Sequence, residues 1–310
     1  MAGAEPHLEF AASSTARRQT RLRPEAGVPY LLLLPTMVLV AGVLVVPVLR
    51  TLVGAFQSFN ELGQTTGLTG LANFRALFDD PVLPGVLRQT AIWTVAITAI
   101  ATPISVGLAL ALNSRFPGRA LARAIVFAPW AISFVFVAII WRFIFDPFYG
   151  YFNDLLSWFG IHTTGTPWLG KPHSALIAVI WVGIQLTIPF TTIVTLAGLQ
   201  SIPEDVVDAA RIDGAGGWAI LKDMILPLLR PILAVATLVN IIYIFNSFPI
   251  VWVMTGGGPV NSTDTVVTYL YKVAFQNNQF GEGAALSALS FLVLMVFSVL
   301  YVRATSREEF

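Results

Sequence analysis

The feature that most constrains this chain is a series of six apolar segments, each long enough to cross a bilayer as a helix. A helix rises about 1.5 Å per residue, so a hydrocarbon core of about 30 Å requires about 20 mostly apolar residues. The qualifying segments lie at roughly residues 29–53, 86–112, 121–145, 174–199, 231–254 and 284–303. Because the backbone of a spanning segment must satisfy its own hydrogen bonds, the sequence predicts an all-α membrane protein.

Composition agrees with a membrane protein and excludes several other classes. Hydrophobic residues make up 56% of the chain and charged residues only 11%, whereas a soluble domain has about 25% charged residues. A net charge of +1 provides no basic field for nucleic acid. The chain has no Cys and only three scattered His, so no metal site is expected. We predict one membrane domain, residues 28–310, after an N-terminal tail, residues 1–27.

The first apolar segment follows four arginines but is longer than a signal-peptide core, and no small-residue cleavage site follows it, so we expect it to be retained. Prolines inside or near the ends of spans predict kinked or broken helices, since neighbouring helices in a bundle can satisfy the freed carbonyls. These prolines are Pro35, Pro47, Pro103, Pro189 and Pro249.

The distribution of basic residues predicts the orientation, because short basic loops stay cytoplasmic. With both termini in the cytoplasm, 12 of the 18 Lys and Arg residues lie on that side and the other 6 lie outside. The inner set is Arg17, Arg18, Arg21, Arg23, Arg115, Arg119, Arg123, Arg211, Lys222, Arg230, Arg303 and Arg307. An even number of spans also places both termini on one side.

The cytoplasmic loop at residues 200–230 has a strong helical pattern. Ser201-Ile202-Pro203-Glu204 fits a capping box that starts a short helix. Gly214 offers a left-handed stop, and Gly216-Gly217 a bend before a second helix from about Trp218. From the pattern alone, a plain helical hairpin on the membrane surface is an equally good interpretation.

The residue string in this loop favours a more specific interpretation. Asp208-Ala209-Ala210, then Gly214, then Met224-Ile225-Leu226-Pro227 resembles the EAA motif of ABC importer permeases, with Asp208 and Met224 at positions usually held by Glu and Ile. Further similar strings are Gly70-Leu71-Ala72-Asn73-Phe74, Asn153, and Leu199-Gln200-Ser201-Ile202-Pro203. The chain looks most like the six-span core of sugar permeases of the maltose-transporter type.

That resemblance implies a six-helix permease bundle in a bacterial inner membrane, contacting lipid. It also implies a second homologous permease subunit, two copies of a cytoplasmic ATPase and an external substrate-binding protein. ATP and Mg would be bound by the ATPase, and this chain would bind no cofactor and catalyse no reaction. The coupling residues that the resemblance implies are Glu204, Asp205, Asp208, Ala209, Ala210, Asp213, Gly214 and Ala215. For Gly214, Ala209 and Ala210, a purely structural role remains an alternative.

The fifth span contains candidates for the solute path. Asn240, Tyr243, Asn246 and Ser247 recur at steps of three and four residues, which places them on one stripe of a helix. The resemblance implies that the path is lined by Trp130, Phe134, Gln185, Leu186, Asn240, Tyr243, Ile244 and Ser247. Gln185 and the apolar Ile244 depart from the maltose-type pattern, which argues against maltose itself. For Trp130 and Phe134, plain helix packing is an equal alternative.

The sequence has three alternatives to a sugar permease, namely a secondary transporter, a membrane enzyme and a permease for another solute. A secondary transporter would place acidic or His side chains within spans, but the one ionisable residue well inside a span is Arg142. A membrane enzyme would need a recognisable catalytic spacing, and Asp80 and Asp146 instead precede prolines as turn starters. The sequence has no P-loop, and Gly256-Gly257-Gly258 is expected to be a turn. Glycerol phosphate and polyols remain as alternative solutes.

Overall fold

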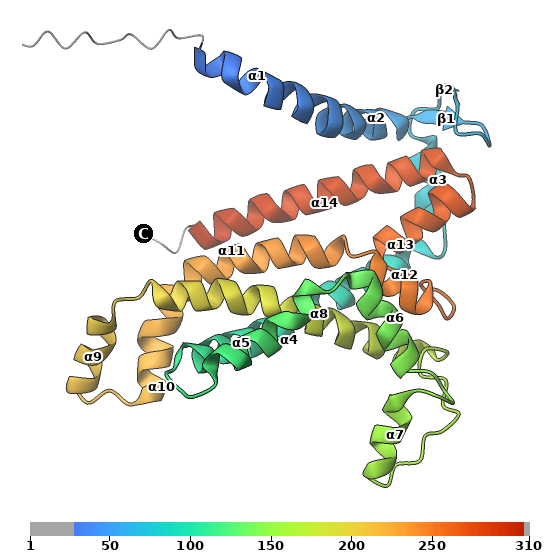
Figure 1. The fold of residues 1–310 in the computed structure, drawn as a ribbon. Helices are drawn as coiled ribbons and strands as arrows, with labels where there is room; N and C mark the ends of the chain where they lie inside the picture. The colour runs from blue at the N-terminus through green and yellow to red at the C-terminus, as the bar shows by residue number, and fades with distance from the viewer. Residues whose placement is uncertain (1–27, 307–310) are drawn as a thin grey trace, which may run out of the picture. The chain divides into compact units, whose positions relative to one another are not determined.

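The computed structural model describes residues 28–306, which are mostly helical (Figure 1). The predicted tail, residues 1–27, and Arg307 lie outside the described residues. The chain divides into two compact units, residues 1–50 and 51–310. The first unit contains α1 (Val28–Val40), a π-helical turn η1 (Ala41–Val45) and most of α2 (Val46–Gly54). Leu32–Gly54 is long and apolar enough to cross a membrane, which confirms the first predicted span.

Four further helical runs of the second unit are long enough to span a bilayer, and they confirm the second, fourth, fifth and sixth predicted spans. They are α4 (Leu83–Asn113), α8 (Pro172–Gln200), Gly217–Thr255 and α14 (Phe280–Ser306). Pro103 and Pro189 lie within α4 and α8 without ending either helix.

The run at Gly217–Thr255 is much longer than the predicted fifth span. It comprises α10 (Gly217–Ala219), the π-helical segment η3 (Ile220–Ile225), α11 (Leu226–Phe245) and α12 (Pro249–Thr255). At about 1.5 Å per residue these 39 residues reach well beyond a hydrocarbon core of about 30 Å. The break before α12 agrees with the interruption expected near Pro249.

The third predicted span is broken. Residues 121–145 contain α5 (Arg119–Phe127), a 3-10 turn η2 (Ala128–Ala131) and α6 (Phe134–Ile144), and the two helical parts meet at 96°. Pro129 can donate no backbone hydrogen bond, and Ile132 is extended at the junction. The third predicted span therefore exists only as a sharply bent pair of helices.

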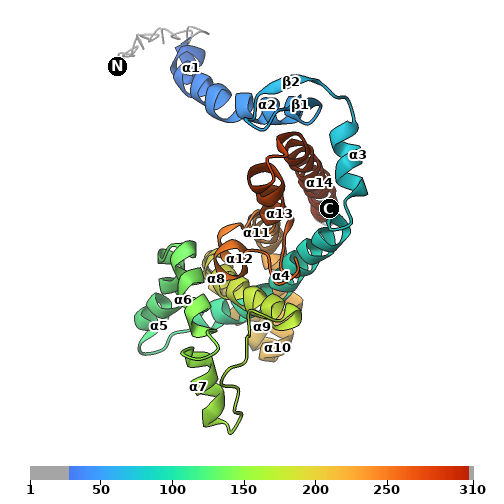
Figure 2. The same cartoon turned by 90° about the vertical axis from the view of Figure 1, so that its right-hand side faces the viewer.

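The core of the second unit forms where α4 packs along α8, the most extensive contact between described helices (Figure 2). A Cβ atom on Gly183 of α8 would lie 2.3 Å from Cδ1 of Ile97 on α4, so a larger residue would force the Ile97 side chain to move. A Cβ atom on Gly198 of α8 would lie 2.9 Å from Cδ2 of Leu229 on α11, so a glycine favours close packing here as well. Small residues are typical where membrane helices pack closely.

The remaining segments are short and lie between the spans. The strands β1 (Gln57–Phe59) and β2 (Thr65–Leu68) pair antiparallel, with an irregularity between Ser58 and Phe59. The short helices are α3 (Ala72–Asp79), α7 (Tyr151–Trp158), α9 (Glu204–Ile212), α13 (Val266–Tyr271) and the π-helical η4 (Lys272–Gln276).

Two asparagines, both noted in the sequence for their resemblance to permeases, hold these connecting segments in place. Asn73 Nδ2 donates to the carbonyls of Ala55 and Gln57, both at 2.9 Å. Asn153 is buried, and its Nδ2 donates to the carbonyls of Asp146 and Pro147, both at 3.0 Å. Both residues therefore have a structural role in loop conformation.

The predicted turn starters act as such. Asp80 Oδ1 accepts from the backbone N–H of Val82 at 2.8 Å, and Tyr269 donates its hydroxyl to Asp80 Oδ2. Burial and the Asp80 carboxylate raise the pKa of Tyr269 well above its usual value, so this donor keeps its proton. The backbone N–H groups of Tyr149 and Phe148 lower the pKa of Asp146.

The predicted turn at Gly256-Gly257-Gly258 is also confirmed, with φ of +60° at Gly256 and +83° at Gly257. The segment after this turn contains several buried polar side chains. Asp264 is completely buried and forms an ion pair with Lys272, with Nζ 2.6 Å from Oδ2, while Thr268 donates to its Oδ1 at 2.9 Å. This network ties the turn to α13 and η4.

Candidate functional site

Seven of the eight residues expected on the solute path line one cavity of about 210 Å³ within the second unit. They are Trp130, Phe134, Leu186, Asn240, Tyr243, Ile244 and Ser247. The eighth, Gln185, lies outside this cavity and accepts a hydrogen bond from Trp141 Nε1 at 2.6 Å. Gln185 and Leu186 are consecutive on α8, so their side chains point about a quarter turn apart.

Three of the four residues in the predicted polar stripe on α11 lie on the cavity wall. Asn240, Tyr243 and Ser247 line the cavity, but Asn246 does not, because it caps the end of α11 and donates to the carbonyl of Ile242 at 2.8 Å. Asn246 is thus a polar neighbour of the cavity that takes no part in its wall.

Aromatic side chains from five helical segments form much of the wall. Trp93 comes from α4, Trp130 from η2, Phe134 from α6, Phe190 from α8 and Tyr243 from α11. The rings of Trp130 and Phe190 lie 6.4 Å apart, and Trp93 Nε1 donates to the carbonyl of Ile244 at 2.9 Å. The wall thus offers ring faces while the buried indole N–H is already paired.

A hydrogen bond between helices fixes the polar side of the cavity. Thr191 on α8 donates its hydroxyl to the carbonyl of Thr187 at 3.2 Å, so its oxygen can accept. Asn240 Nδ2 donates to that oxygen at 2.7 Å. The carboxamide oxygen of Asn240 has no partner among residues 28–306, which leaves it as an acceptor beside the cavity.

No Asp, Glu, Lys, Arg or His is among the described residues that line the cavity. Arg142, the ionisable side chain noticed in the sequence, instead donates to the carbonyl of Val253 at 3.3 Å and is exposed. Within residues 28–306, no three His, Asp or Glu side chains are placed to hold a metal ion. The cavity can therefore offer hydrogen bonds and ring faces, but no charge.

The sequence did not reveal several members of this cavity. Trp93, Thr187 and Phe190 line it, and Thr191 supports it from behind. The spacing of Gly183, Thr187 and Thr191 by four residues is the signal that could have indicated this face of α8. Helical spacing alone does not say which faces of α4 and α8 meet.

The loop at residues 200–230 is the second candidate site, and its first helix does not start as expected. The predicted capping box at Ser201 is wrong, because α9 begins at Glu204 after Pro203 and has no side-chain cap. Ser201 belongs to the end of α8, where its hydroxyl donates to the carbonyl of Gly198 at 2.7 Å. A capping box is present at Thr265 and Thr268.

The end of α9 is as expected. Gly214 has φ of +84°, its N–H bonds to Arg211 O at 3.1 Å, and the N–H of Ala215 bonds to Ala210 O at 2.9 Å. These two bonds form a Schellman motif, which requires a left-handed residue at the position of Gly214. A Cβ atom at Gly214 would find nothing within 4 Å, so the glycine lies at an open surface.

Most of the predicted coupling residues are accessible on this projecting loop. Asp205, Asp208, Ala209, Asp213 and Gly214 are exposed, Ala215 is half-buried, and Ala210 is at the edge of burial. Glu204 starts the helix, and its side chain lies outside the described part of the structure.

Two large apolar side chains on the same loop were not anticipated. Ile212 is 86% exposed and Trp218 is 73% exposed. Apolar side chains gathered with small residues at a projecting tip are typical of a protein contact. The exposure of Ile212 and Trp218 suits a protein contact, and it also suits the alternative of a helical hairpin lying on the membrane surface.

A helical protein with several apolar spans, an uncharged cavity lined by their described residues and a projecting loop is, as a class, a membrane permease. The chain belongs to the family of binding-protein-dependent transport system inner membrane components, which matches residues 101–307. The resemblance to ABC importer permeases is thereby confirmed, and the protein is an inner-membrane component of such a transporter.

Relatives with similar sequences agree with this assignment. A probable ABC transporter permease protein of Brucella suis biovar 1 (strain 1330) is 42% identical over 91% of this chain and 97% of its own length. The trehalose/maltose transport system permease protein MalF of Thermococcus litoralis is 32% identical over 90% of this chain and 94% of its own.

The fold also matches a solved structure. A chain of a bacterial ABC transporter involved in the import of the acidic polysaccharide alginate superposes with a TM-score of 0.79. The match covers 90% of this chain and 95% of the other, at 24% sequence identity. It confirms the predicted permease fold.

Proposed function

We propose that this permease forms half of the translocation path of an ATP-driven importer for an uncharged sugar or oligosaccharide. The observation that carries the proposal is the cavity, which combines ring faces with hydroxyl and amide groups and has no charged side chain among its described lining residues. Stacking on aromatic rings and a few fixed polar groups suit the pyranose ring and its hydroxyls. The relative named for trehalose and maltose transport supports this class of solute.

The absence of charged side chains among the described lining residues also argues against the alternative solutes. A phosphorylated solute such as glycerol phosphate would need a cation beside the path, and no lining residue supplies one. A polyol would find hydrogen-bond partners but would use the aromatic walls less. A secondary transporter would need a coupling carboxylate or His in the cavity, and the described lining has none.

The partners follow from the family and the loop. The other half of the path would come from a second homologous permease, and an external binding protein would deliver the sugar. Two cytoplasmic ATPase subunits would hydrolyse ATP with Mg, and one of them would dock on the loop at residues 200–230 through Ile212, Gly214 and Trp218. This chain itself would remain non-catalytic.

The docking role requires the loop to be cytoplasmic, with both termini on the same side. The unequal distribution of Lys and Arg supports this orientation. The end of α8, the loop helices and the start of α11 lie at one end of the second unit (Figure 1). The long run from Gly217 can therefore extend out of the bilayer on that side.

Replacing cavity residues tests the path. Asn240→Ala and Thr191→Val are expected to raise the half-saturating sugar concentration for uptake by up to about tenfold, since a hydrogen bond contributes about 0.5–1.5 kcal/mol. Thr191→Val removes the acceptor that orients Asn240, whereas Thr191→Ser keeps it. Uptake into proteoliposomes containing the whole complex is the measurement.

The controls separate binding from helix packing. If the Asn240–Thr191 bond only joins helices, its loss should lower stability by about 0.6 kcal/mol and leave uptake unchanged. Asn246→Ala alters an amide on the same helix but outside the cavity, so its kinetics should be normal. Normal kinetics in Asn240→Ala and Tyr243→Ala proteins that assemble at normal levels would contradict the proposed path.

A further inference from the structure

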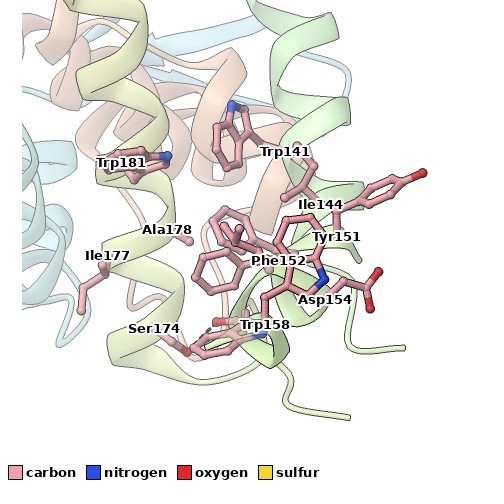
Figure 3. A pocket seen from close by; sticks show the side chains of 13 residues that line it. Trp141, Ile144, Tyr151, Phe152, Asp154, Trp158, Ser174, Ile177, Ala178 and Trp181 are labelled. Carbon is pink, nitrogen blue, oxygen red and sulfur yellow. Dashed lines mark hydrogen bonds between the residues drawn. The ribbon is translucent and has the colours of Figure 1, made fainter. Parts of the chain in front are cut away.

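A second, larger hollow lies away from the solute cavity, between α6, α7 and the first turns of α8 (Figure 3). This groove has a volume of about 610 Å³, within the range of about 300–1,000 Å³ typical of small-molecule sites. Four of the eight tryptophans in the chain line it. Its lining consists of Trp141, Ile144, Phe145, Tyr151, Phe152, Asp154, Leu155, Trp158, Trp168, Ser174, Ile177, Ala178 and Trp181.

The groove has almost no polar groups for a sugar to contact. Asp154 and Ser174 are its only strongly polar members. Ser174 already donates its hydroxyl to the carbonyl of Trp168 at 2.5 Å, and Figure 3 shows the carboxylate of Asp154 pointing away from the rings. The expected occupant is therefore apolar.

The indole groups divide into two kinds. Trp141 and Trp168 donate their N–H groups to Gln185 and Asn153, at 2.6 and 2.8 Å. Trp158 and Trp181 have no hydrogen-bond partner among residues 28–306, and they are 82% and 54% exposed. The rim of the groove thus combines apolar rings with two available N–H donors.

The position of the groove along α8 matches a membrane interface. The 29 residues of α8, Pro172–Gln200, make it about 43 Å long, which exceeds a hydrocarbon core of about 30 Å. If α8 is centred on the core, Ser174 lies just outside one boundary and Trp181 lies about 7 Å inside it. The groove then spans the membrane interface, where Trp and Tyr are enriched.

The lining of the groove favours contact with the chain of a lipid over recognition of its headgroup. The described lining residues include no Lys or Arg, and the basic residues that flank them in sequence, Arg142 and Lys171, are exposed and do not line the groove. An anionic headgroup would find no cation among the lining residues, whereas an acyl chain requires none. The apolar face of α6 continues from the groove, with Ile140 and Phe143 exposed.

We propose that the groove binds one acyl chain of a membrane phospholipid, whose ester carbonyls accept hydrogen bonds from Trp158 and Trp181. Binding anchors α7 at the bilayer surface. With the orientation proposed above, the lipid belongs to the outer leaflet. The inference does not depend on which solute the importer carries.

Tryptophan fluorescence tests this site in the complete complex, reconstituted into phosphatidylcholine vesicles with or without bromine on the acyl chains. Bromine quenches only indoles that contact the chains, and aqueous iodide quenches indoles that face water. Subtracting the spectrum of a Trp158→Phe or Trp181→Phe variant isolates the signal of that residue. Both side chains are exposed and the replacements keep a ring, so folding should be unaffected.

The expected result is that brominated lipid removes most of the Trp158 and Trp181 emission, while iodide has little effect. Replacing part of the phosphatidylcholine with anionic lipid should not change this. Trp218, exposed on the loop at residues 200–230, is the matched control and should not respond to brominated lipid. Quenching of Trp158 by iodide alone would show an aqueous groove, and protection from both quenchers a protein-covered one; either result would overturn the proposal.

Discussion

Gly214→Val is expected to abolish transport and ATPase docking while leaving the spans folded. A left-handed conformation costs a residue with a Cβ atom about 1–2 kcal/mol, and more for a branched one, so the Schellman bonds of Ala215 and Gly214 should be lost. No internal clash would result, because a Cβ atom there has nothing within 4 Å. Co-purification of the ATPase subunit and sugar uptake are the two measurements.

Gly216→Val provides the matched control for this change. Gly216 is two residues away and exposed, but its φ of −70° and ψ of 157° are extended, a conformation that valine adopts readily. Gly216→Val should therefore reduce ATPase binding and sugar uptake much less than Gly214→Val. If Gly214→Val retained normal ATPase binding and uptake, the docking role of α9 would lose its main support.

Lys272→Met is expected to destabilise the folded protein by about 3–5 kcal/mol, the usual cost of removing one partner of a buried ion pair. Asp264 has no exposed surface, and its other oxygen accepts only from Thr268. The remaining carboxylate would be buried without a cation. Thermal unfolding of the solubilised complex, or the yield of folded protein, should show the loss.

The double variant Asp264→Asn with Lys272→Met separates charge from packing. Asparagine keeps an acceptor for Thr268 and removes the unpaired charge, so the double variant should be more stable than Lys272→Met alone. A single variant as stable as the parent would mean that the Asp264–Lys272 pair does not hold this segment.

The sequence predicted the spans and one wall of the cavity because both depend on local patterns. Apolar length alone identifies α4, α8 and α14, and three- and four-residue steps on α11 identify Asn240, Tyr243 and Ser247. Gln185 and Leu186 were placed on the path by the family resemblance, which aligns positions along a helix but does not determine which way each side chain points. Leu186 lines the cavity, whereas Gln185 accepts a hydrogen bond from Trp141 outside it.

What the sequence missed depends on contacts between distant segments. Thr191 supports Asn240 across the contact between α8 and α11, and a 49-residue separation hides this pairing in the sequence. The bend before α6 was missed because apolar length is the same for a straight and a broken segment. Ser201 fitted a capping box by composition, but Pro203 moved the start of α9 past it.

The most direct test of the account is ATP hydrolysis by the reconstituted complex, with its binding protein present, as a function of the solute added. We predict that an uncharged sugar stimulates hydrolysis and is taken up, and that Asn240→Ala weakens both responses together. Stimulation by phosphorylated or acidic solutes alone would contradict the neutral-sugar path. Uptake driven by an ion gradient without any ATPase subunit would contradict the importer itself.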